Sequence, residues 1–352
     1  MSASDWSAVA ARQHRTLPSA TGTVLSVLLI AAVSVFACWV VGSRPLDIGT
    51  DTATYAQFYE ALGSGPLETR LEPGFVALST ALHRLGLDIT GYQTALFATM
   101  LLTVFVAVYV YHQALGRPRG GLGLLSAGLM LLFVSPMFVN ASINALRQGL
   151  AALPVFAALL SFQQRRWWAF AVLGAVACSL HLSSALYLVC APLLLLRERW
   201  LGALAVLAFV AYVTGLSAIV VRTGAPALHE FVMEYTANER TRSGVRVDFA
   251  VFSVFWYVLA RLALPMVRAP LRDAMRESTS VYLVMLLPFF AVGWGFFSNR
   301  YLLPAWLAAS LVLGAVLQFN RLAALRHPLT IRAGLVASCA VFAYYVANGV
   351  VV

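Results

Sequence analysis

The sequence predicts an all-α polytopic integral membrane protein. Of its 352 residues, 61% are hydrophobic and 11% are charged, whereas about 25% charged residues are usual in a soluble domain. Apolar runs long enough to span a bilayer recur along the chain. The alternating segments of about ten residues that mark a transmembrane barrel are absent. We therefore expect a single transmembrane domain over 20–352, preceded by a basic cytoplasmic N-terminal segment, 1–19.

The apolar runs predict eleven membrane-spanning helices. The first run is long enough to span and follows a short basic segment, so we expect a retained helix rather than a cleaved signal peptide. The fifth and sixth runs are shorter than the ~20 residues that a full span needs. They form either a broken helix pair that meets at His181 or two half-helices. The expected spans are 20–42, 91–113, 119–138, 141–162, 167–181, 183–196, 200–221, 249–268, 279–298, 300–319 and 331–351.

One further apolar stretch, 73–87, is too short to span and carries His83 and Arg84. We expect it to form a re-entrant or interfacial helix in an outer loop. The distribution of arginine supports this topology. All 24 basic residues are arginine, and an N-terminus inside leaves 14 of them with 4 acids in the inner loops, against 9 with 10 acids outside. If 73–87 crossed the membrane, the positive-inside bias would reverse.

This topology predicts an N-terminus inside, a C-terminus outside and two long outer loops, 43–90 and 222–248. A GT-C-like architecture fits the same arrangement. Arg261 is left within a span as the main midplane charge. The net charge of +10 is explained by loop arginines that set topology, so we expect a bilayer and no nucleic-acid partner. The four cysteines fall in apolar runs and indicate neither a disulfide set nor a metal site.

Several polar residues come together on the predicted outer face. Arg147 stands between Leu146 and Leu150, where a charged side chain is tolerated only with a partner. That partner is an acid such as Asp51 or Glu72, an anionic ligand, or both in turn. The full candidate set is Asp51, Tyr55, Glu72, Arg147, Gln148, His181, Arg246, Arg300 and Tyr301.

Most of these residues also have a purely structural interpretation. Asp51 could be a solvated residue or the N-cap of a helix over 52–61. The remaining alternatives are an interfacial aromatic belt around Tyr55, a helix cap at Glu72 before Pro73, snorkelling of Arg147, a core role for His181, and a solvated loop for Arg240, Arg242 and Arg246.

The candidate set suits the chemistry of a lipid diphosphate. Arginines bind phosphate bidentately and stay charged. A nearby carboxylate or histidine can act as general base on a hydroxyl, and aromatic rings suit sugars. No zinc pattern, P-loop or dinucleotide fingerprint is present, and Asp47 with Asp51 is a weak metal signal. We expect neither a metal nor a cofactor.

At these residues the sequence resembles the EpsG family, a branch of the Wzy-type polysaccharide polymerases. The matching pieces keep their order over most of the chain. They are Asp51, Tyr55 and Tyr59; Glu72-Pro73-Gly74-Phe75; Arg147-Gln148-Gly149-Leu150-Ala151; His181 with Ser183 and Ser184; and Arg300-Tyr301.

The resemblance implies a membrane glycosyltransferase of exopolysaccharide or O-antigen assembly. Such an enzyme joins oligosaccharide repeat units carried on undecaprenyl diphosphate. It implies a multi-pass protein of the bacterial inner membrane with its active site facing the periplasm or exterior. Donor and acceptor are both polyprenyl-diphosphate-linked oligosaccharides, and a chain-length regulator and a flippase are candidate further partners.

We interpret Arg147 and Arg300 as binding the donor diphosphate, with Gln148, Tyr301 and Tyr55 as further substrate-binding residues. His181, or else Asp51 or Glu72, takes the proton from the acceptor hydroxyl. Glu72 could instead orient Arg147, and Arg246 could close over the donor.

Three other classes of protein remain open. A GT-C-type transferase would add single sugars from a polyprenyl-phosphate donor. A membrane O-acyltransferase would use a central histidine. A polysaccharide flippase or transporter, the non-enzyme alternative, would distribute charges through the midplane and often show repeat symmetry.

Overall fold

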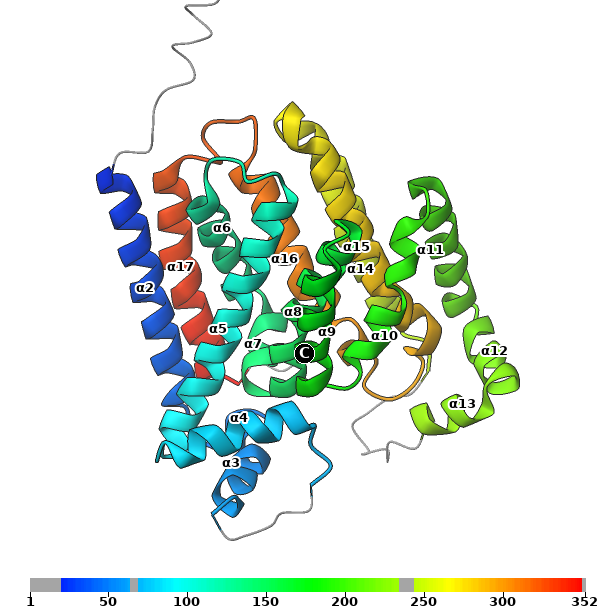
Figure 1. Cartoon of the computed structure of the whole chain (residues 1–352), viewed down its shortest axis with the longest axis horizontal. Coiled ribbons are helices and arrows are strands. Elements are labelled where there is room, and N and C mark those ends of the chain that lie inside the picture. The colour runs from blue at the N-terminus through cyan, green and yellow to red at the C-terminus, as the bar shows by residue number, and fades with distance from the viewer. Residues whose placement is uncertain (1–19, 64–68, 234–243, 350–352) are drawn as a thin grey trace, which may run out of the picture.

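Long apolar helices run side by side in the computed structural model, which describes residues 20–63, 69–233 and 244–349 (Figure 1). The predicted N-terminal segment 1–19 lies outside the described residues. The α-helices are α2 (Ala20–Gly42), α3 (Thr52–Ala61), α4 (Pro73–Arg84), α5 (Ile89–Ala114), α6 (Gly121–Phe133), α7 (Pro136–Ile143), α8 (Leu146–Gln163), α9 (Trp167–Leu180), α10 (Ser184–Val189), α11 (Glu198–Val213), α12 (Leu216–Gly224), α13 (Pro226–Met233), α14 (Val247–Ala263), α15 (Arg272–Val292), α16 (Leu303–Gln318) and α17 (Pro328–Ala347).

The centre of the bundle is α8, which is buried nearly all round. It packs against α5, α9 and α16. By contrast, α2 buries one narrow stripe and exposes apolar side chains such as Val35 and Trp39. An apolar helix with an uncovered apolar face is typical of a helix that faces lipid. The described part of the chain therefore confirms an all-helical membrane protein.

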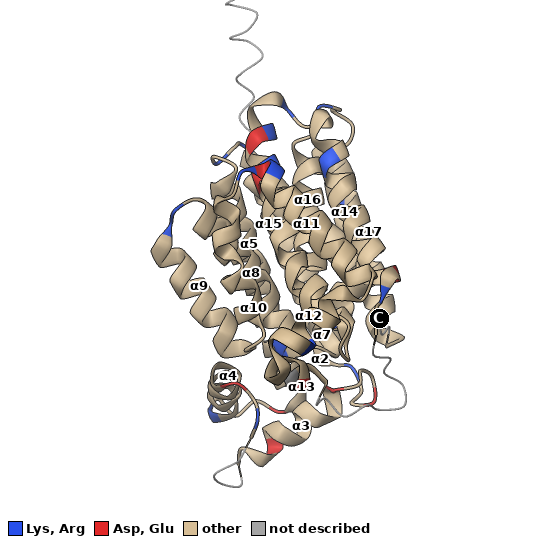
Figure 2. Cartoon of the chain, turned by 90° about the vertical axis from the view of Figure 1, so that its right-hand side faces the viewer, with Lys and Arg blue, Asp and Glu red and all other residues tan. Residues whose placement is uncertain are grey.

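Two short helices, α3 and α4, lie at one end of the bundle, and α4 runs across that end rather than along it (Figure 1). We call this the α3–α4 end and the other the opposite end. Charged residues gather at the two ends and leave the middle of the bundle almost free of them (Figure 2). The helix predicted within 73–87 is thus present and, at 12 residues, is too short to span.

Six helices of the described chain are long and apolar enough to cross a membrane, or up to eight if each of two bent pairs is one span. The bent pairs are α6 with α7 (79°) and α11 with α12 (90°). Shorter apolar helices cover 167–180, 184–195 and 303–318. These helices fall where the eleven spans were predicted. The count of eleven and the orientation stay predictions.

Several predicted boundaries are wrong. The sequence suggested spans over 119–138 and 141–162, but Pro136 starts a separate short helix and α8 begins only at Leu146. Proline is favoured in the first turn of a helix, where its missing N–H costs nothing, and Pro136 takes that position in α7. The span predicted over 279–298 begins earlier, at Arg272.

The tenth span, predicted over 300–319, begins later than expected, at Leu303. Arg300 and Tyr301 do not open it, because they form a short 3-10 turn, η4 (Ser298–Tyr301), before α16. Arg261 falls within the apolar helical stretch 247–266, as predicted, but towards one end of it rather than at its middle. Arg261 lies in the last turn of α14 and pairs with Glu198, the first residue of α11. It therefore lies at the opposite end of the bundle.

Candidate functional site

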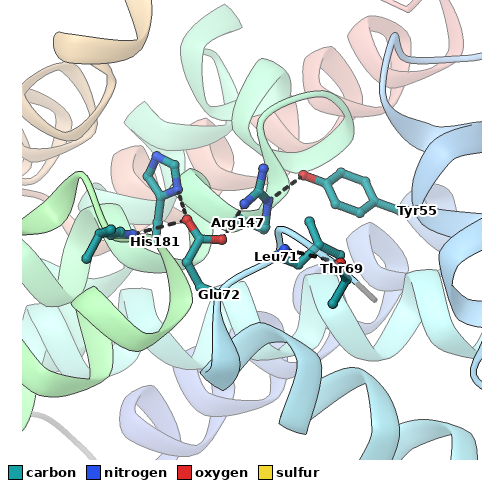
Figure 3. Close-up of polar contacts among 7 residues, drawn as sticks. Tyr55, Thr69, Leu71, Glu72, Arg147 and His181 are labelled. Atoms are coloured by element: carbon teal, nitrogen blue, oxygen red, sulfur yellow. Dashed lines mark hydrogen bonds and ion pairs between the residues drawn. The ribbon is translucent and has the colours of Figure 1, made fainter. Parts of the chain in front are cut away.

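At the α3–α4 end, Glu72 contacts two distant segments of the chain, the start of α8 and the end of α9 (Figure 3). Its Oε2 accepts a hydrogen bond from Arg147 at the start of α8. Its Oε1 accepts one from Nδ1 of His181 at 2.9 Å and one from the backbone N–H of Leu182 at 3.1 Å. Both carboxylate oxygens are thus held by donors, and Glu72, one of the two acids considered, is the partner of Arg147.

The start of α4 sets the position of Glu72. Glu72 is the N-cap residue and Pro73 the first helical residue, as the structural interpretation of this motif expected. The Glu72 side chain makes no capping hydrogen bond, however, and turns instead to Arg147 and His181. A Cβ atom at Gly74 would lie 2.4 Å from Oγ of Ser179 and 2.7 Å from its carbonyl oxygen. Only glycine allows α4 to approach the end of α9, where His181 follows.

The end of α9 presents His181. This residue is the C-cap of the helix, with an extended backbone, and three residues separate α9 from α10. The predicted break at His181 is therefore confirmed. Since an ionised carboxylate only accepts hydrogen bonds, Nδ1 carries the proton in the bond to Glu72. The described residues give Nε2 no hydrogen-bond partner.

Arg147 is held from two sides. Its Nε donates to the hydroxyl of Tyr55 at 3.2 Å, and one terminal nitrogen donates to Glu72. The side chain remains 22% exposed, and its second terminal nitrogen forms no hydrogen bond within the described chain. Tyr55, on α3, packs against Phe75 of α4 with ring centroids 5.4 Å apart. Arg147 is therefore fixed in direction but keeps donors for a ligand.

The electrostatics of the cluster keep Glu72 ionised. Burial alone raises the pKa of its carboxyl. The hydrogen bond from His181 and the positive charge of Arg147 outweigh burial and lower the pKa to about 2. A carboxylate with so low a pKa is a weak proton acceptor at neutral pH. Of the three residues considered as general base, Glu72 is thus the least suited to that role.

Arg300 and Asp51 form a second, looser pair. Their closest nitrogen and oxygen lie 3.8 Å apart, and both side chains are about one-third exposed. This distance is beyond a hydrogen bond. Asp51 occupies the N-cap position of α3, so the predicted 52–61 helix is confirmed, but its side chain makes no capping bond. The Arg300 guanidinium lies 4.4 Å from the ring centroid of Phe297, a geometry that stabilises a cation.

Phe297 adopts a left-handed backbone conformation, with φ of 55°. This conformation is strained for a bulky residue, and such strain clusters at binding and catalytic sites. The turn that follows is anchored by two buried side chains. Gln148 donates through its amide to the carbonyl of Arg300, and Tyr187 donates to the carbonyl of Tyr301 at 2.9 Å. Arg300 is thereby held beside the first turn of α8, which carries Arg147.

Gln148 differs from its predicted role in one respect. It is only 5% exposed, and its amide points to the backbone of η4. It therefore supports Arg300 rather than lining an open surface. The backbone of Tyr301 is likewise used to anchor the turn.

Arg246 forms a different pair, with Asp248 at 2.6 Å, and its guanidinium covers the ring of Phe249 at 3.9 Å. Its backbone N–H donates to the Tyr212 hydroxyl. Within the described residues, no hydrogen bond or ion pair joins Arg246 to Glu72 or Arg300. Arg240 and Arg242 lie outside the described residues.

Three structural contributions were not found by sequence reasoning. They are Tyr187, the close approach at Gly74, and Asn144. The Asn144 Oδ1 accepts the backbone N–H of Thr50 at 2.6 Å and so fixes the residue before Asp51. The pair of asparagines in the apolar stretch 140–144 was a usable signal, because buried amides need hydrogen-bond partners. Over the described residues, no three His, Cys, Asp or Glu side chains are grouped to hold a metal ion.

A family model described as the EpsG family matches residues 27–304. The matched range includes Tyr55, Glu72, Arg147 and His181, and also the η4 turn that carries Arg300. No curated protein matches the chain. No solved structure matches it either.

Proposed function

Because the chain belongs to the EpsG family, the family of Wzy-type exopolysaccharide polymerases, we propose that it polymerises lipid-linked oligosaccharides. Family membership supports a membrane polysaccharide polymerase, which is a glycosyltransferase. The finer proposal is that donor and acceptor are repeat units on undecaprenyl diphosphate, and that they meet at the extracytoplasmic face of the cell membrane. The predicted arginine topology, which puts the α3–α4 end outside, supports that location.

The observation that carries the proposal is the contact of Glu72 with both Arg147 and His181. This contact places Arg147, whose guanidinium can bind phosphate, beside His181, whose ring nitrogen can accept the proton of a hydroxyl. A glycosyl transfer from a lipid diphosphate needs both groups. One stabilises the leaving diphosphate and the other accepts the proton of the attacking hydroxyl.

His181 is the general base of this proposal. Glu72 fixes the ring through Nδ1–H and leaves the Nε2 lone pair for the acceptor hydroxyl. Carboxylate–histidine pairs hold the tautomer and orientation of the base in the same way in serine proteases. On the sequence alone, Glu72 is a candidate base, a helix cap or a residue that orients Arg147; in this proposal it orients both Arg147 and His181. Asp51, the third candidate, faces Arg300 instead.

Arg147 and Arg300 bind the donor diphosphate. Arg147 contributes its remaining guanidinium donors, and Arg300 exchanges its loose contact with Asp51 for phosphate oxygens. The acceptor oxygen forms a bond to the anomeric carbon of the donor sugar. The bond from that carbon to the diphosphate oxygen breaks, and the lipid diphosphate leaves with the electron pair. The hydroxyl proton passes to Nε2 of His181 and then to water.

Mass spectrometry of lipid-linked glycans in cells that lack the protein tests this function. A polymerase predicts accumulation of a single complete repeat unit and loss of long chains. Wild type restores the chains and Arg147→Ala does not, although the variant is inserted in the membrane. A repeat unit that lacks one sugar points to a single-sugar transferase, and an unchanged lipid-linked pool contradicts both enzymatic functions.

A further inference from the structure

The opposite end of the bundle carries a charged cluster that the proposed polymerisation does not use. Glu198, at the start of α11, pairs with Arg261 of α14. The same guanidinium donates to the Thr279 hydroxyl of α15 at 3.4 Å. Arg261 is therefore fixed among three helices, and its charge is neutralised by Glu198.

Beside this pair lies a shallow hollow that is wide open to its surroundings. Its lining residues are Arg197, Glu198, Arg199, Gly202 and Tyr257. Gly202 leaves the space open, since a Cβ atom there would meet no atom within 4 Å. The hollow thus lies between the start of α11 and the neighbouring face of α14.

The hollow has an excess of positive charge. Glu198 is engaged by Arg261, whereas no described carboxylate forms an ion pair with Arg197 or Arg199. Both of these arginines are exposed, and Arg199 lies 5.3 Å from the ring centroid of Trp200. Two unneutralised guanidinium groups at a helix N-terminus, where the backbone also carries partial positive charge, favour an anion.

The surroundings of the hollow are apolar. Leu195, Trp200 and Leu262 are 64%, 58% and 71% exposed, respectively. Leu195 comes two residues before Arg197, Trp200 follows Arg199 on α11, and Leu262 follows Arg261 on α14. A ligand that fits both parts has an anionic head and hydrocarbon chains. Trp and Tyr beside basic residues are also typical of the lipid headgroup level.

We propose that this hollow binds the phosphate headgroup of an anionic phospholipid. Arg197 and Arg199 hold the phosphate oxygens, and the acyl chains lie along the exposed apolar faces of α11 and α14. Basic pockets between transmembrane helices recognise lipid headgroups by this chemistry. If the arginines served topology alone, the protein would not prefer anionic over zwitterionic lipids at this position, and Gly202 would not affect lipid binding.

Native mass spectrometry of the full chain with phosphatidylglycerol or phosphatidylcholine of equal chain length tests the proposal. The wild type should retain phosphatidylglycerol preferentially. Arg197→Ala with Arg199→Ala should weaken that binding about tenfold. Gly202→Leu, which places a side chain in the hollow without changing charge, should weaken it too. The matched control is Arg321→Ala with Arg326→Ala, two exposed arginines of the loop between α16 and α17, which should bind like wild type.

Three results would overturn the proposal. One is an equal loss of phosphatidylglycerol binding in the Arg321→Ala, Arg326→Ala control, which would indicate a diffuse charge effect. Another is unchanged phosphatidylglycerol binding in the Arg197→Ala, Arg199→Ala double variant, whatever the effect of Gly202→Leu. The last is competition by inorganic phosphate at the same concentration as the lipid, which would indicate a free-anion site. The correct mass and helical content of each variant show that it is folded.

Discussion

Nδ1 of His181 and Oε1 of Glu72 lie 2.9 Å apart, although the two residues are separated by 109 positions in the sequence. The bond joins the end of α9 to the start of α4. Because Glu72 is also bonded to Arg147, one carboxylate orients both the proposed base and a proposed phosphate-binding group. We therefore expect variants that keep this bond to behave differently from variants that break it.

His181→Asn tests the base separately from the structure. The asparagine amide can donate to Glu72 as Nδ1 does, but it has no group that takes a proton at Nε2. We expect the turnover number to fall by about 10²- to 10⁴-fold, as for loss of a general base. Thermal stability and donor affinity should change little. An asparagine variant with wild-type turnover would remove His181 from the proton transfer.

Glu72→Gln tests the ionisation of the cluster. The pKa of Glu72 is lowered from 4.5 to about 2, so its ionised form stabilises the folded state above about pH 4.5. That contribution is lost as the pH falls through 2. The melting temperature of wild type should therefore exceed that of Glu72→Gln at pH 5 and above. The difference should narrow as the pH falls from 4.5 toward 2.

The control for this titration is Glu60→Gln, at an exposed position of α3. The difference in melting temperature between Glu60→Gln and wild type should stay small over the same pH range. A difference for Glu72→Gln that is constant from pH 6 to pH 2.5 would contradict an ionised Glu72 in the folded protein.

Gly74→Ala tests the packing that brings α4 to α9. The added methyl group would meet Ser179 at 2.4 Å, so α4 must shift and Glu72 must move away from His181. We expect at least a tenfold loss of polymerisation, since a displacement of about 1 Å can cost ~10² in rate. Gly224→Ala, at a helical glycine with no neighbour within 4 Å, is the matched control. Equal activities of the two variants would show that the close approach is unimportant.

Arg147→Lys keeps the positive charge and removes the planar fork. Lysine is unable to reach both the Tyr55 hydroxyl and Glu72 while offering donors to a diphosphate. We expect the variant to lose most activity, with Arg147→Ala lower still. Kinetics with a defined lipid-linked repeat unit measure this. Full activity of the lysine variant would indicate a general charge effect instead of directed binding.

Tyr187→Phe tests the anchoring of η4. It leaves the Tyr301 carbonyl without its buried donor, a loss worth about 1–3 kcal/mol. Arg300 should then be less well placed, so the KM for the donor should rise several-fold with little change in the pH profile. Tyr282→Phe, which removes a similar buried bond to the Ser253 carbonyl, is the control. If both variants raise KM equally, the effect is one of stability.

The helical membrane fold could be predicted because apolar runs directly report segments that prefer lipid. The partner of Arg147 could be narrowed to Asp51 or Glu72 for a related reason, since a charge beside an apolar run needs an opposite charge nearby. The helix at 52–61 and the break at His181 were also expected, and both are present.

Side-chain directions could not be predicted in the same way. Gln148 was assigned to substrate binding with its neighbour Arg147, yet it points into the protein. Successive helical residues point about 100° apart, so the direction of the Gln148 side chain depends on the residue at which α8 begins. The position of Arg261 along its helix was hard to predict for a similar reason, because it depends on where α14 ends. Tyr187 and Gly74 act through contacts with distant segments, which local patterns do not reveal.

The most direct measurement is polymerisation by the purified, reconstituted protein supplied with one defined diphosphate-linked repeat unit. Wild type, His181→Asn and Arg147→Ala are compared by the length of lipid-linked chains that each forms. We expect a ladder of chains with wild type, a much slower ladder with His181→Asn and almost none with Arg147→Ala. Chains of equal length at equal rates from all three proteins would contradict a reaction centred on Glu72, Arg147 and His181.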